Sequence, residues 1–269
     1  MIRAVARLIA LDVDGTLLTS QETVTERTRR ALAAAETSGW HVVIVTGRPL
    51  SAALPVVHDL ALGEYVVASN GATIAHIHSG SVLFQSSLPG AAVADAIRHA
   101  RRAVPGLGAA VTTPRGFFRE AGFGVVAPLS EFEGERVDDA SPLDDESVQA
   151  TVLFKSDLDA RTLLDAIGPV LPPGVEVSAS GLGGALDLTE PGINKASGLD
   201  RLCSLVGVAR RDVVAFGDGI NDHEMLAWAG LGVAMDNALP QTKAVADEVT
   251  ASNDEDGIAL VVERLLGLR

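Results

Sequence analysis

The sequence contains a single cysteine, Cys203, among its 269 residues. One cysteine excludes an intrachain disulfide and any cysteine-rich zinc or iron–sulfur site, and it favours a reducing compartment. Basic residues are also scarce, because 21 Lys and Arg stand against 35 Asp and Glu and the formal net charge is −14. A chain with this charge is poorly suited to neutralising a phosphate backbone, so we expect no nucleic-acid partner.

Long hydrophobic runs are missing as well. The apolar stretch at residues 5–11 is interrupted by Arg7 and followed by Asp12, and it is far shorter than the ~20 residues that a membrane-spanning helix needs. We therefore expect no membrane partner and a cytoplasmic location. Hydrophobic residues still make up 47% of the chain, which is typical of a globular protein and not of a disordered one.

Short runs rich in Val, Ile and Ala recur near both ends of the chain, with helical patterns between them, at residues 8–13, 41–46, 65–69, 213–217 and 231–235. Nearly continuous apolarity is typical of parallel strands that are buried on both faces. After the first strand, Thr23 and Glu26 predict a capping box at the start of a helix that Gly39 ends. The pattern predicts an α/β fold with a doubly wound, Rossmann-like parallel sheet.

The character of the sequence changes in the middle of the chain. Gly- and Pro-rich breaks there separate predicted helices from predicted strands, and the strand–helix alternation resumes only later. A length of 269 residues also suits about two domains of ~150 residues or one domain with a large insertion. We therefore expect residues 1–88 and 184–269 to form one core and residues 89–183 to form an inserted α/β cap.

Four carboxylates follow predicted strands of the core. Asp12 and Asp14 follow the first strand, and Asp218 and Asp222 follow the strand at 213–217. Ligands of open α/β sheets bind at the carboxyl ends of the strands, although a helix cap and a turn residue would explain the first pair equally well. If the four carboxylates converge, their repulsion requires a bound cation, and oxygen-only ligands with open water positions favour Mg²⁺.

Candidate anion-binding groups occur at the same end of the predicted sheet. Thr46 and Gly47 end the second strand, where a hydroxyl and backbone N–H groups can hold an anion. Lys195 lies in the first turn of an amphipathic helix, a position that the helix dipole makes unfavourable for a cation unless an anion lies in front of it; a surface lysine is the alternative. Two carboxylates, a hard divalent metal and such donors are suited to attack on a phosphoryl group.

The sequence resembles the haloacid dehalogenase-like (HAD) hydrolases. The four signature motifs of that family match, in the same order, segments 12–16 and 45–48, Lys195 and segment 217–222. Segments 69–72, 232–235 and 252–257 are similar to phrases of the Cof-type phosphatases, whose α/β cap lies between the second and third motifs. The sequence departs from the family at Ala196, where Gly is frequent, and at Asp236, where Gly is usual. Neither departure removes a catalytic group.

The resemblance implies a role for each matched residue. Asp12 would be the nucleophile that forms an aspartyl-phosphate, and Asp14 would protonate the leaving group and then activate water. The expected phosphate- or substrate-binding residues are Thr46, Gly47, Lys195, Asn221 and Asn70. Mg²⁺ would be held by Asp12, the backbone carbonyl of Asp14 and Asp218, with Asp222 supporting the site.

The resulting interpretation is a Mg²⁺-dependent phosphatase whose partner is a small phosphorylated metabolite, such as a sugar phosphate or a phosphorylated cofactor. Two alternatives stay open, a phosphomutase or other phosphotransferase with the same intermediate and a catalytically silent metabolite-binding regulator. Four residues of the insertion are candidates for reading the distal part of a substrate, or else belong to the packing and the solvated surface of the cap: Arg115, Phe117, Phe118 and Arg119. The identity of the substrate and the oligomeric state do not follow from the sequence.

Overall fold

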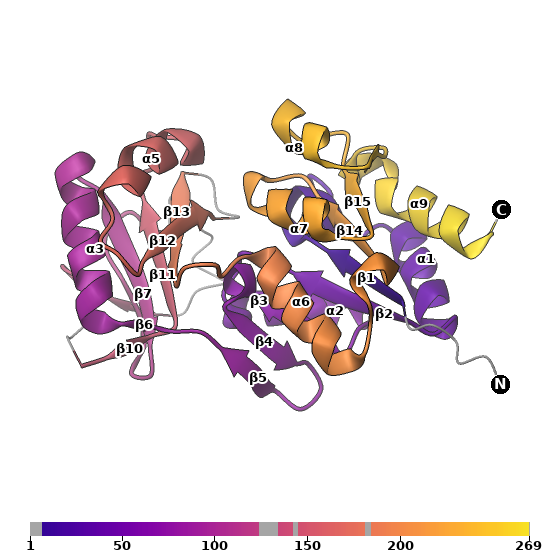
Figure 1. The fold of residues 1–269 in the computed structure, drawn as a ribbon, viewed down its shortest axis with the longest axis horizontal. Coiled ribbons are helices and arrows are strands. Elements are labelled where there is room, and N and C mark those ends of the chain that lie inside the picture. Colours follow the sequence, from indigo (N-terminus) through magenta and orange to yellow (C-terminus); the bar gives the residue numbers. More distant parts are fainter. Residues whose placement is uncertain (1–6, 124–133, 142–144, 181–183, 269) are drawn as a thin grey trace.

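The computed structural model describes residues 7–123, 134–141, 145–180 and 184–268, which form two lobes joined by two crossings of the chain (Figure 1). The larger lobe is built on an eight-stranded sheet. The first six strands in its order are parallel to one another, and each of the last two pairs antiparallel with the strand before it. The strand order is β16 (Glu248–Val249), β15 (Leu231–Ala234), β14 (Val213–Gly217), β1 (Arg7–Leu11), β2 (Trp40–Val45), β3 (Tyr65–Ala68), β4 (Thr73–His76) and β5 (Ser81–Gln85).

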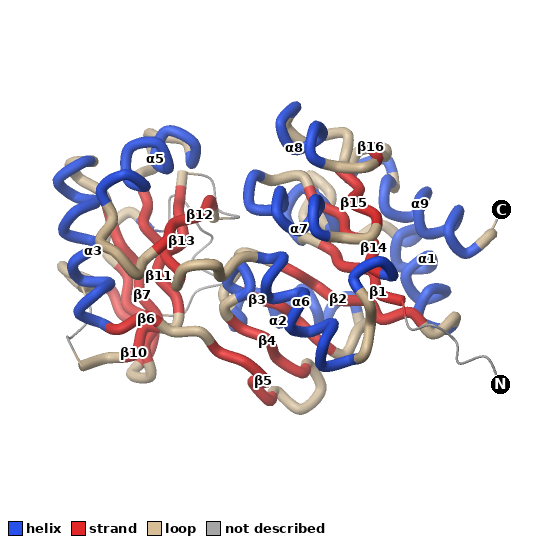
Figure 2. The backbone as a smooth tube through the Cα atoms, in the orientation of Figure 1, coloured by secondary structure: helices blue, strands red, loops and turns tan. Residues whose placement is uncertain are grey.

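Helices cover both faces of this sheet (Figure 2). Ile9 and Leu11 of β1 belong to the hydrophobic cluster that α1 (Glu26–Thr37), α2 (Leu50–Leu60) and α9 (Gly257–Leu266) complete. Leu8 and Ala10 belong to the opposite cluster, with α6 (Lys195–Val206) and α7 (His223–Trp228), beside which lies α8 (Pro240–Val245). The alternation along β1 thus divides its side chains between two cores, and the predicted doubly wound α/β fold is confirmed.

The first helix of the core begins later than the sequence predicts. The prediction of a capping box at Thr23 and Glu26 is wrong, because α1 begins at Glu26 and its N-cap is Thr25. The hydroxyl of Thr25 accepts a hydrogen bond from the N–H of Thr28 at 3.1 Å. The carbonyl of Thr23 instead accepts from the N–H of Thr19 in the preceding turn. Three hydroxyl residues precede the helix within six positions, and spacing alone does not reveal which one becomes the cap.

The smaller lobe is the predicted inserted α/β unit. Its two longer helices, α3 (Gly90–Ala103) and α5 (Ala160–Ile167), pack on one face of a six-stranded sheet, and β6 (Leu88–Pro89) pairs separately with β10 (Ser147–Val148). The sheet has the order β12 (Glu176–Ala179), β13 (Ala185–Thr189), β11 (Ala150–Phe154), β7 (Gly108–Thr113), β8 (Gly116–Arg119) and β9 (Glu135–Arg136). Within the described ranges, no helix has both the length and the apolarity needed to cross a membrane.

The chain returns to the larger lobe later than expected. We expected the core to resume at residue 184, but β13 pairs antiparallel with β11 and β12 of the smaller sheet, so the crossing lies between Thr189 and Lys195. The glycines at 181, 183 and 184 have the composition of a linker between domains. An apolar strand that follows them does not reveal by its own residues which of two sheets it joins.

Candidate active site

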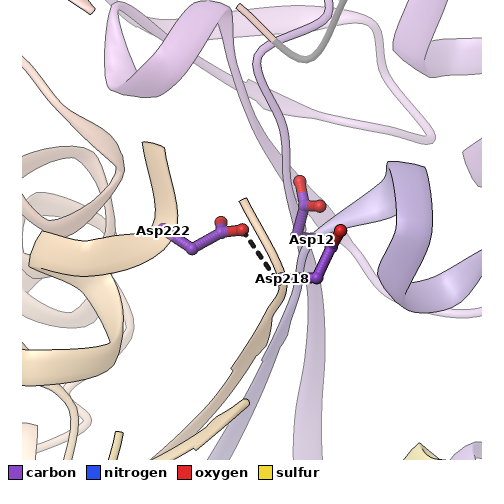
Figure 3. Close-up of side chains that lie close together, drawn as sticks. All are labelled: Asp12, Asp218 and Asp222. Atoms are coloured by element: carbon purple, nitrogen blue, oxygen red, sulfur yellow. Dashed lines mark hydrogen bonds between the residues drawn. The ribbon is translucent and has the colours of Figure 1, made fainter. Parts of the chain in front are cut away.

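Three aspartates from two distant parts of the chain meet at the carboxyl ends of two neighbouring strands. Asp12 follows β1, Asp218 follows β14, and Asp222 immediately precedes α7 (Figure 3). Because β1 and β14 are paired in parallel, their ends lie side by side. One oxygen of each carboxylate lies within 4.8 Å of the others, so the predicted convergence of these three residues is observed.

The turn after β1 is shaped to contact Asp218. Gly15 adopts a φ of +76°, which favours glycine, and a Cβ at this position would overlap the Asp218 carboxylate. The hydroxyl of Thr16 donates a hydrogen bond of 2.7 Å to Asp218 Oδ1. The segment from Asp12 to Thr16 therefore supplies one carboxylate of the cluster and orients a second.

Lys195 is the buried cation of the site, with 0% of its surface exposed. Its Nζ donates hydrogen bonds of 2.6 Å to Asp12 Oδ1 and 2.7 Å to Asp222 Oδ1. Asn194 caps α6 through Ser197, and this cap places Lys195 in the first turn, as predicted. Although burial opposes the charge, the two carboxylates raise the pKa of Lys195 above its ordinary value, so the surface-lysine alternative does not hold.

Asp222 is fully buried, and protein donors reach both of its oxygens. Oδ2 accepts from the backbone N–H groups of Asp218 at 3.0 Å and Gly219 at 2.8 Å, and Oδ1 accepts from Lys195. These bonds hold the loop after β14 in the conformation that points Asp218 at Asp12. Asp222 thereby orients the other members of the cluster.

The cluster carries more negative charge than its lysine balances. Burial raises the pKa of Asp12 well above its ordinary value, with the Asp222 charge adding to the effect and Lys195 opposing it. Burial likewise raises the pKa of Asp218 to about 6, against the hydrogen bond from Thr16. Three carboxylates around one ammonium leave an excess of two negative charges. An all-oxygen donor set with this charge suits a hard divalent cation, so these residues can hold a metal ion.

The carboxylate of Asp14 points to a different partner. Arg48 donates to it from Nε at 2.9 Å and from Nη2 at 2.6 Å, and the cluster that could hold a metal ion consists of the other three aspartates. Asp14 lies two residues after Asp12 with a backbone φ of −80° and ψ of 120°. The structure thus places its side chain next to the loop after β2.

The loop after β2 contains the predicted anion-binding groups. Thr46 and Gly47 are both buried, and the Thr46 hydroxyl accepts from the N–H of Arg48 at 3.1 Å, which leaves the hydroxyl proton available for donation. The Thr46 carbonyl also accepts from the N–H of Asn70 at 3.0 Å. This bond joins the loop after β2 to the turn after β3.

Asn70 and Asn221 lie between the two lobes. Asn221 Nδ2 donates to Asn70 Oδ1 at 3.0 Å, and Asn70 Nδ2 donates to Asp187 Oδ2 on β13 at 2.6 Å. Both asparagines and Lys195 line a cavity of about 90 Å³. Asp187 is not among the residues predicted for the site, although a lone carboxylate within the apolar strand at 185–189 is a signal that could have identified it.

The four residues of the insertion that were candidates for reading the substrate make contacts inside the smaller lobe. Arg115 forms an ion pair with Glu146 and lies 4.9 Å from the centre of the Phe118 ring, and the Phe117 and Phe123 rings are 5.5 Å apart. Arg119 lies beside them on β8. No contact with the aspartate cluster is observed for these four residues in the described part of the chain.

Neither departure from the family pattern disturbs the cluster. Ala196 lies inside α6 and is buried, as its place in a helix predicts. The exposed Asp236 carboxylate accepts a hydrogen bond from Lys243 Nζ at 2.8 Å, so its charge is balanced locally.

Comparisons with known proteins identify the family. A family model described as haloacid dehalogenase-like hydrolase matches residues 9–262. The chain is 30% identical to the 5-amino-6-(5-phospho-D-ribitylamino)uracil phosphatase YbjI of Escherichia coli, over 97% of this chain and 96% of that protein. It is 31% identical to the HMP-PP phosphatase of Cronobacter sakazakii, over 89% and 87%.

Solved structures show the same architecture. The HAD subclass IIB sugar phosphatase BT4131 superposes with a TM-score of 0.80 at 26% identity, and the match covers 97% of this chain and 99% of that one. A haloacid dehalogenase-like hydrolase from Bacteroides thetaiotaomicron gives a TM-score of 0.77 at 28% identity with the same coverage. The motifs, the fold and the relatives agree, and the chain belongs to the haloacid dehalogenase-like hydrolases.

Proposed function

We propose that this protein is a Mg²⁺-dependent phosphatase that hydrolyses small phosphorylated metabolites through an aspartyl-phosphate on Asp12. The observation that carries the proposal is the placement of Asp12. Lys195 binds one of its oxygens at 2.6 Å, and no hydrogen bond from the described residues occupies the other. A buried carboxylate that is held at one oxygen and open at the second is a positioned nucleophile.

The remaining groups match the needs of phosphoryl transfer. The hydroxyl of Thr46, the N–H of Gly47, the ammonium of Lys195 and the amide of Asn221 are the donors proposed for the phosphoryl oxygens. Asn70 lines the same cavity as Lys195 and Asn221. Fixed donors around the charge that spreads over these oxygens lower the barrier to transfer.

Asp14 is proposed to exchange the proton. Asp12 attacks phosphorus, the bond to the leaving oxygen breaks, and Asp14 gives that oxygen a proton. Asp14 then takes a proton from the water that attacks the aspartyl-phosphate, which releases inorganic phosphate and restores Asp12. Arg48 holds Asp14 next to the site for both steps.

Mg²⁺ is the proposed cofactor, held by Asp12, Asp218 and the backbone carbonyl of Asp14, with Asp222 orienting this set. When bound, it neutralises charge on the phosphoryl group. The excess of two negative charges in the cluster and its oxygen donors support this assignment.

The relatives suggest which substrates to test first. Their names specify a ribitylaminouracil phosphate, HMP-PP and sugar phosphates, which share a phosphate group on a small organic molecule. We propose the same class for this chain. Phosphate release is measured from hexose phosphates, the ribitylaminouracil phosphate, HMP-PP, flavin mononucleotide and pyridoxal phosphate, with Mg²⁺ and with EDTA.

The comparison uses wild type, Asp12→Asn and Asp165→Asn, a matched loss of charge at an exposed residue of α5. We expect release that requires both Mg²⁺ and Asp12 and that is unchanged in Asp165→Asn. Isomerisation of a sugar phosphate without net release would establish the phosphomutase instead. Binding without turnover of any compound would establish the regulator.

A further inference from the structure

Asn70 occupies an unusual position between the lobes. Ser69 and Asn70 have φ values of +49° and +50°, in a left-handed region that is unfavourable for most residues other than glycine. Their N–H groups are bound by the carbonyls of Arg48 at 2.9 Å and Thr46 at 3.0 Å. Asn70 is also 1% exposed. A strained and buried polar residue that its neighbours hold in place is often functional.

The side chain of Asn70 connects two parts of the molecule that the chain separates widely. Its Oδ1 accepts from Asn221 on the loop of the aspartate cluster, and its Nδ2 donates to Asp187 on β13 of the smaller lobe. We call the series Asp187, Asn70 and Asn221 the amide relay. Since Asp187 is its only member in the smaller lobe, the relay is complete only when that lobe lies against the core.

The chemistry of Asp187 gives the relay a direction. An ionised carboxylate only accepts hydrogen bonds, whereas an amide has a donor end and an acceptor end of nearly equal shape. Asp187, at 2.6 Å, is the nearest of three acceptors that the smaller lobe presents to the Asn70 NH₂ group; the Ser178 hydroxyl and the Ala179 carbonyl lie at 3.4 Å. Together they select the orientation in which Asn70 turns its NH₂ group to the smaller lobe and its oxygen to Asn221. Asn221 must then turn its own NH₂ group to Asn70, so the orientation of its oxygen is selected as well.

Packing does not explain why this position carries a charge. Leu186 and Leu188 of β13 belong to the hydrophobic cluster of the smaller lobe. Because side chains alternate along a strand, Asp187 points to the opposite face of the sheet, where it meets Asn70. Asp187 is 8% exposed, and burial raises its pKa to about 7 even though Ser180, Lys195 and Asn70 oppose the shift. A buried carboxylate is costly for folding, so another property of the residue must account for it.

We propose that Asp187 is a positioning residue, which orients the amide of Asn70 and through it the amide of Asn221 toward the phosphoryl group when the smaller lobe covers the core. The inference rests on the proposed phosphatase function for its activity readout. It assigns to the smaller lobe a part in assembling the site as well as in covering it.

The first test is Asp187→Asn, which keeps the shape but removes the acceptor-only charge. The expected result is a fall of about tenfold in kcat with little change in KM, a loss typical of groups that orient the residues of a site. The melting temperature should stay the same or rise, because a buried charge is lost. A merely structural residue would show the opposite, a lower melting temperature with an unchanged kcat. The control is Asp165→Asn, which should change neither.

The second test is a double-mutant cycle between Asp187→Asn and Asn221→Ala, two residues that the relay joins through Asn70. We expect the Asp187→Asn loss to disappear when Asn221 is already Ala, and to disappear in an Asn70→Ala background. An equal fold-loss in all three backgrounds would overturn the relay, as would an unchanged kcat in Asp187→Asn.

The affinity for inorganic phosphate in the presence of Mg²⁺, measured by calorimetry on the same variants, gives a readout without turnover. If wild type releases phosphate from no compound but binds it with the same coupling, the proposed phosphatase function fails and the relay stands. If wild type is active and the effects are additive in both measurements, the relay fails and the phosphatase function stands.

Discussion

Arg48 binds both oxygens of Asp14, through Nε at 2.9 Å and Nη2 at 2.6 Å, and its side chain is only 10% exposed. Two parallel N–H···O bonds fix the plane of a carboxylate as well as its distance. The residue proposed to exchange the proton is thus oriented by the loop that carries Thr46. Each oxygen of Asp14 accepts one bond from Arg48 and keeps a second lone pair, so Asp14 can exchange a proton while Arg48 holds it.

Replacing Arg48 should therefore affect substrates unequally. We expect Arg48→Met to lower kcat/KM about tenfold or more for an alkyl phosphate, whose leaving group needs a proton. The loss should be smaller for p-nitrophenyl phosphate, whose leaving group departs without one. Steady-state kinetics with both substrates checks this. Equal losses would show that Arg48 acts on phosphate binding and not through Asp14.

Asp12→Asn should abolish turnover, because an amide oxygen is a poor nucleophile and the residue volume hardly changes. We expect kcat to fall by roughly 10³-fold or more, as for the loss of other covalent nucleophiles. Circular dichroism should show an unchanged fold. Hydrolysis at the wild-type rate would exclude the aspartyl-phosphate.

Lys195→Met should cost both activity and stability. Removing one partner of a buried ion pair leaves uncompensated charge, here on Asp12 and Asp222, and typically costs about 3–5 kcal/mol. The cost should be greater at pH 8 than at pH 5, because the pKa of Asp12 is raised and Asp12 can take up a proton at the lower pH. Urea unfolding in EDTA at both pH values measures the difference. A pH-independent cost would mean that Asp12 stays ionised without Lys195.

Stabilisation by Mg²⁺ should increase with pH. The pKa of Asp218 rises from its ordinary value of 3.8 to about 6 on folding, and the pKa of Asp12 is raised as well. The metal-free native state therefore binds more protons than the unfolded chain, and these groups lower the free energy of unfolding as pH rises through 4 to 6.

Bound Mg²⁺ requires the ionised carboxylates, so its effect on the melting temperature should be larger at pH 7.5 than at pH 5. Thermal unfolding with Mg²⁺ and with EDTA tests this expectation. Asp218→Asn serves as the control and should lose most of the metal effect. An equal shift at both pH values would place the ion elsewhere.

Gly15→Ala and Gly39→Ala separate backbone strain from steric overlap. Both glycines have positive φ, +76° and +84°, but a Cβ on Gly15 meets the Asp218 carboxylate whereas a Cβ on Gly39 meets nothing within 4 Å. We expect Gly39→Ala to cost about 1 kcal/mol and to leave activity unchanged. Gly15→Ala should cost more and should lose Mg²⁺-dependent activity. Equal effects of the two substitutions would mean that Asp218 moves aside freely.

Much of the site could be predicted because its residues follow strands with strong signals. The apolar runs that became β1, β2 and β14 place Asp12, Thr46 and Asp218 at one edge of a parallel sheet without further information. Lys195 was identifiable from a conflict between its charge and its place in a helix. In both cases a local pattern was enough.

Pairings between side chains that are distant in the sequence could not be predicted from it. Nothing local indicates that Arg48 would bind Asp14, or that Asp187 would reach Asn70 from a different lobe. The expected boundary at residue 184 also placed Asp187 in the core, whereas β13 belongs to the smaller lobe. Contacts of this kind depend on how two lobes meet, which composition and periodicity do not describe.

The central position of β1 also determines the order in which the molecule can be assembled. Leu8 pairs with His41 on one side and with Val213 on the other, so the neighbours of β1 come from opposite sides of the inserted lobe. That lobe is continuous in sequence from β6 to β13 and can fold as a unit during synthesis. The core must close a much longer loop to pair β1 with β14, because the whole smaller lobe lies between these two strands in the sequence. β1 therefore acquires its second neighbour, β14, only after the whole smaller lobe has been made.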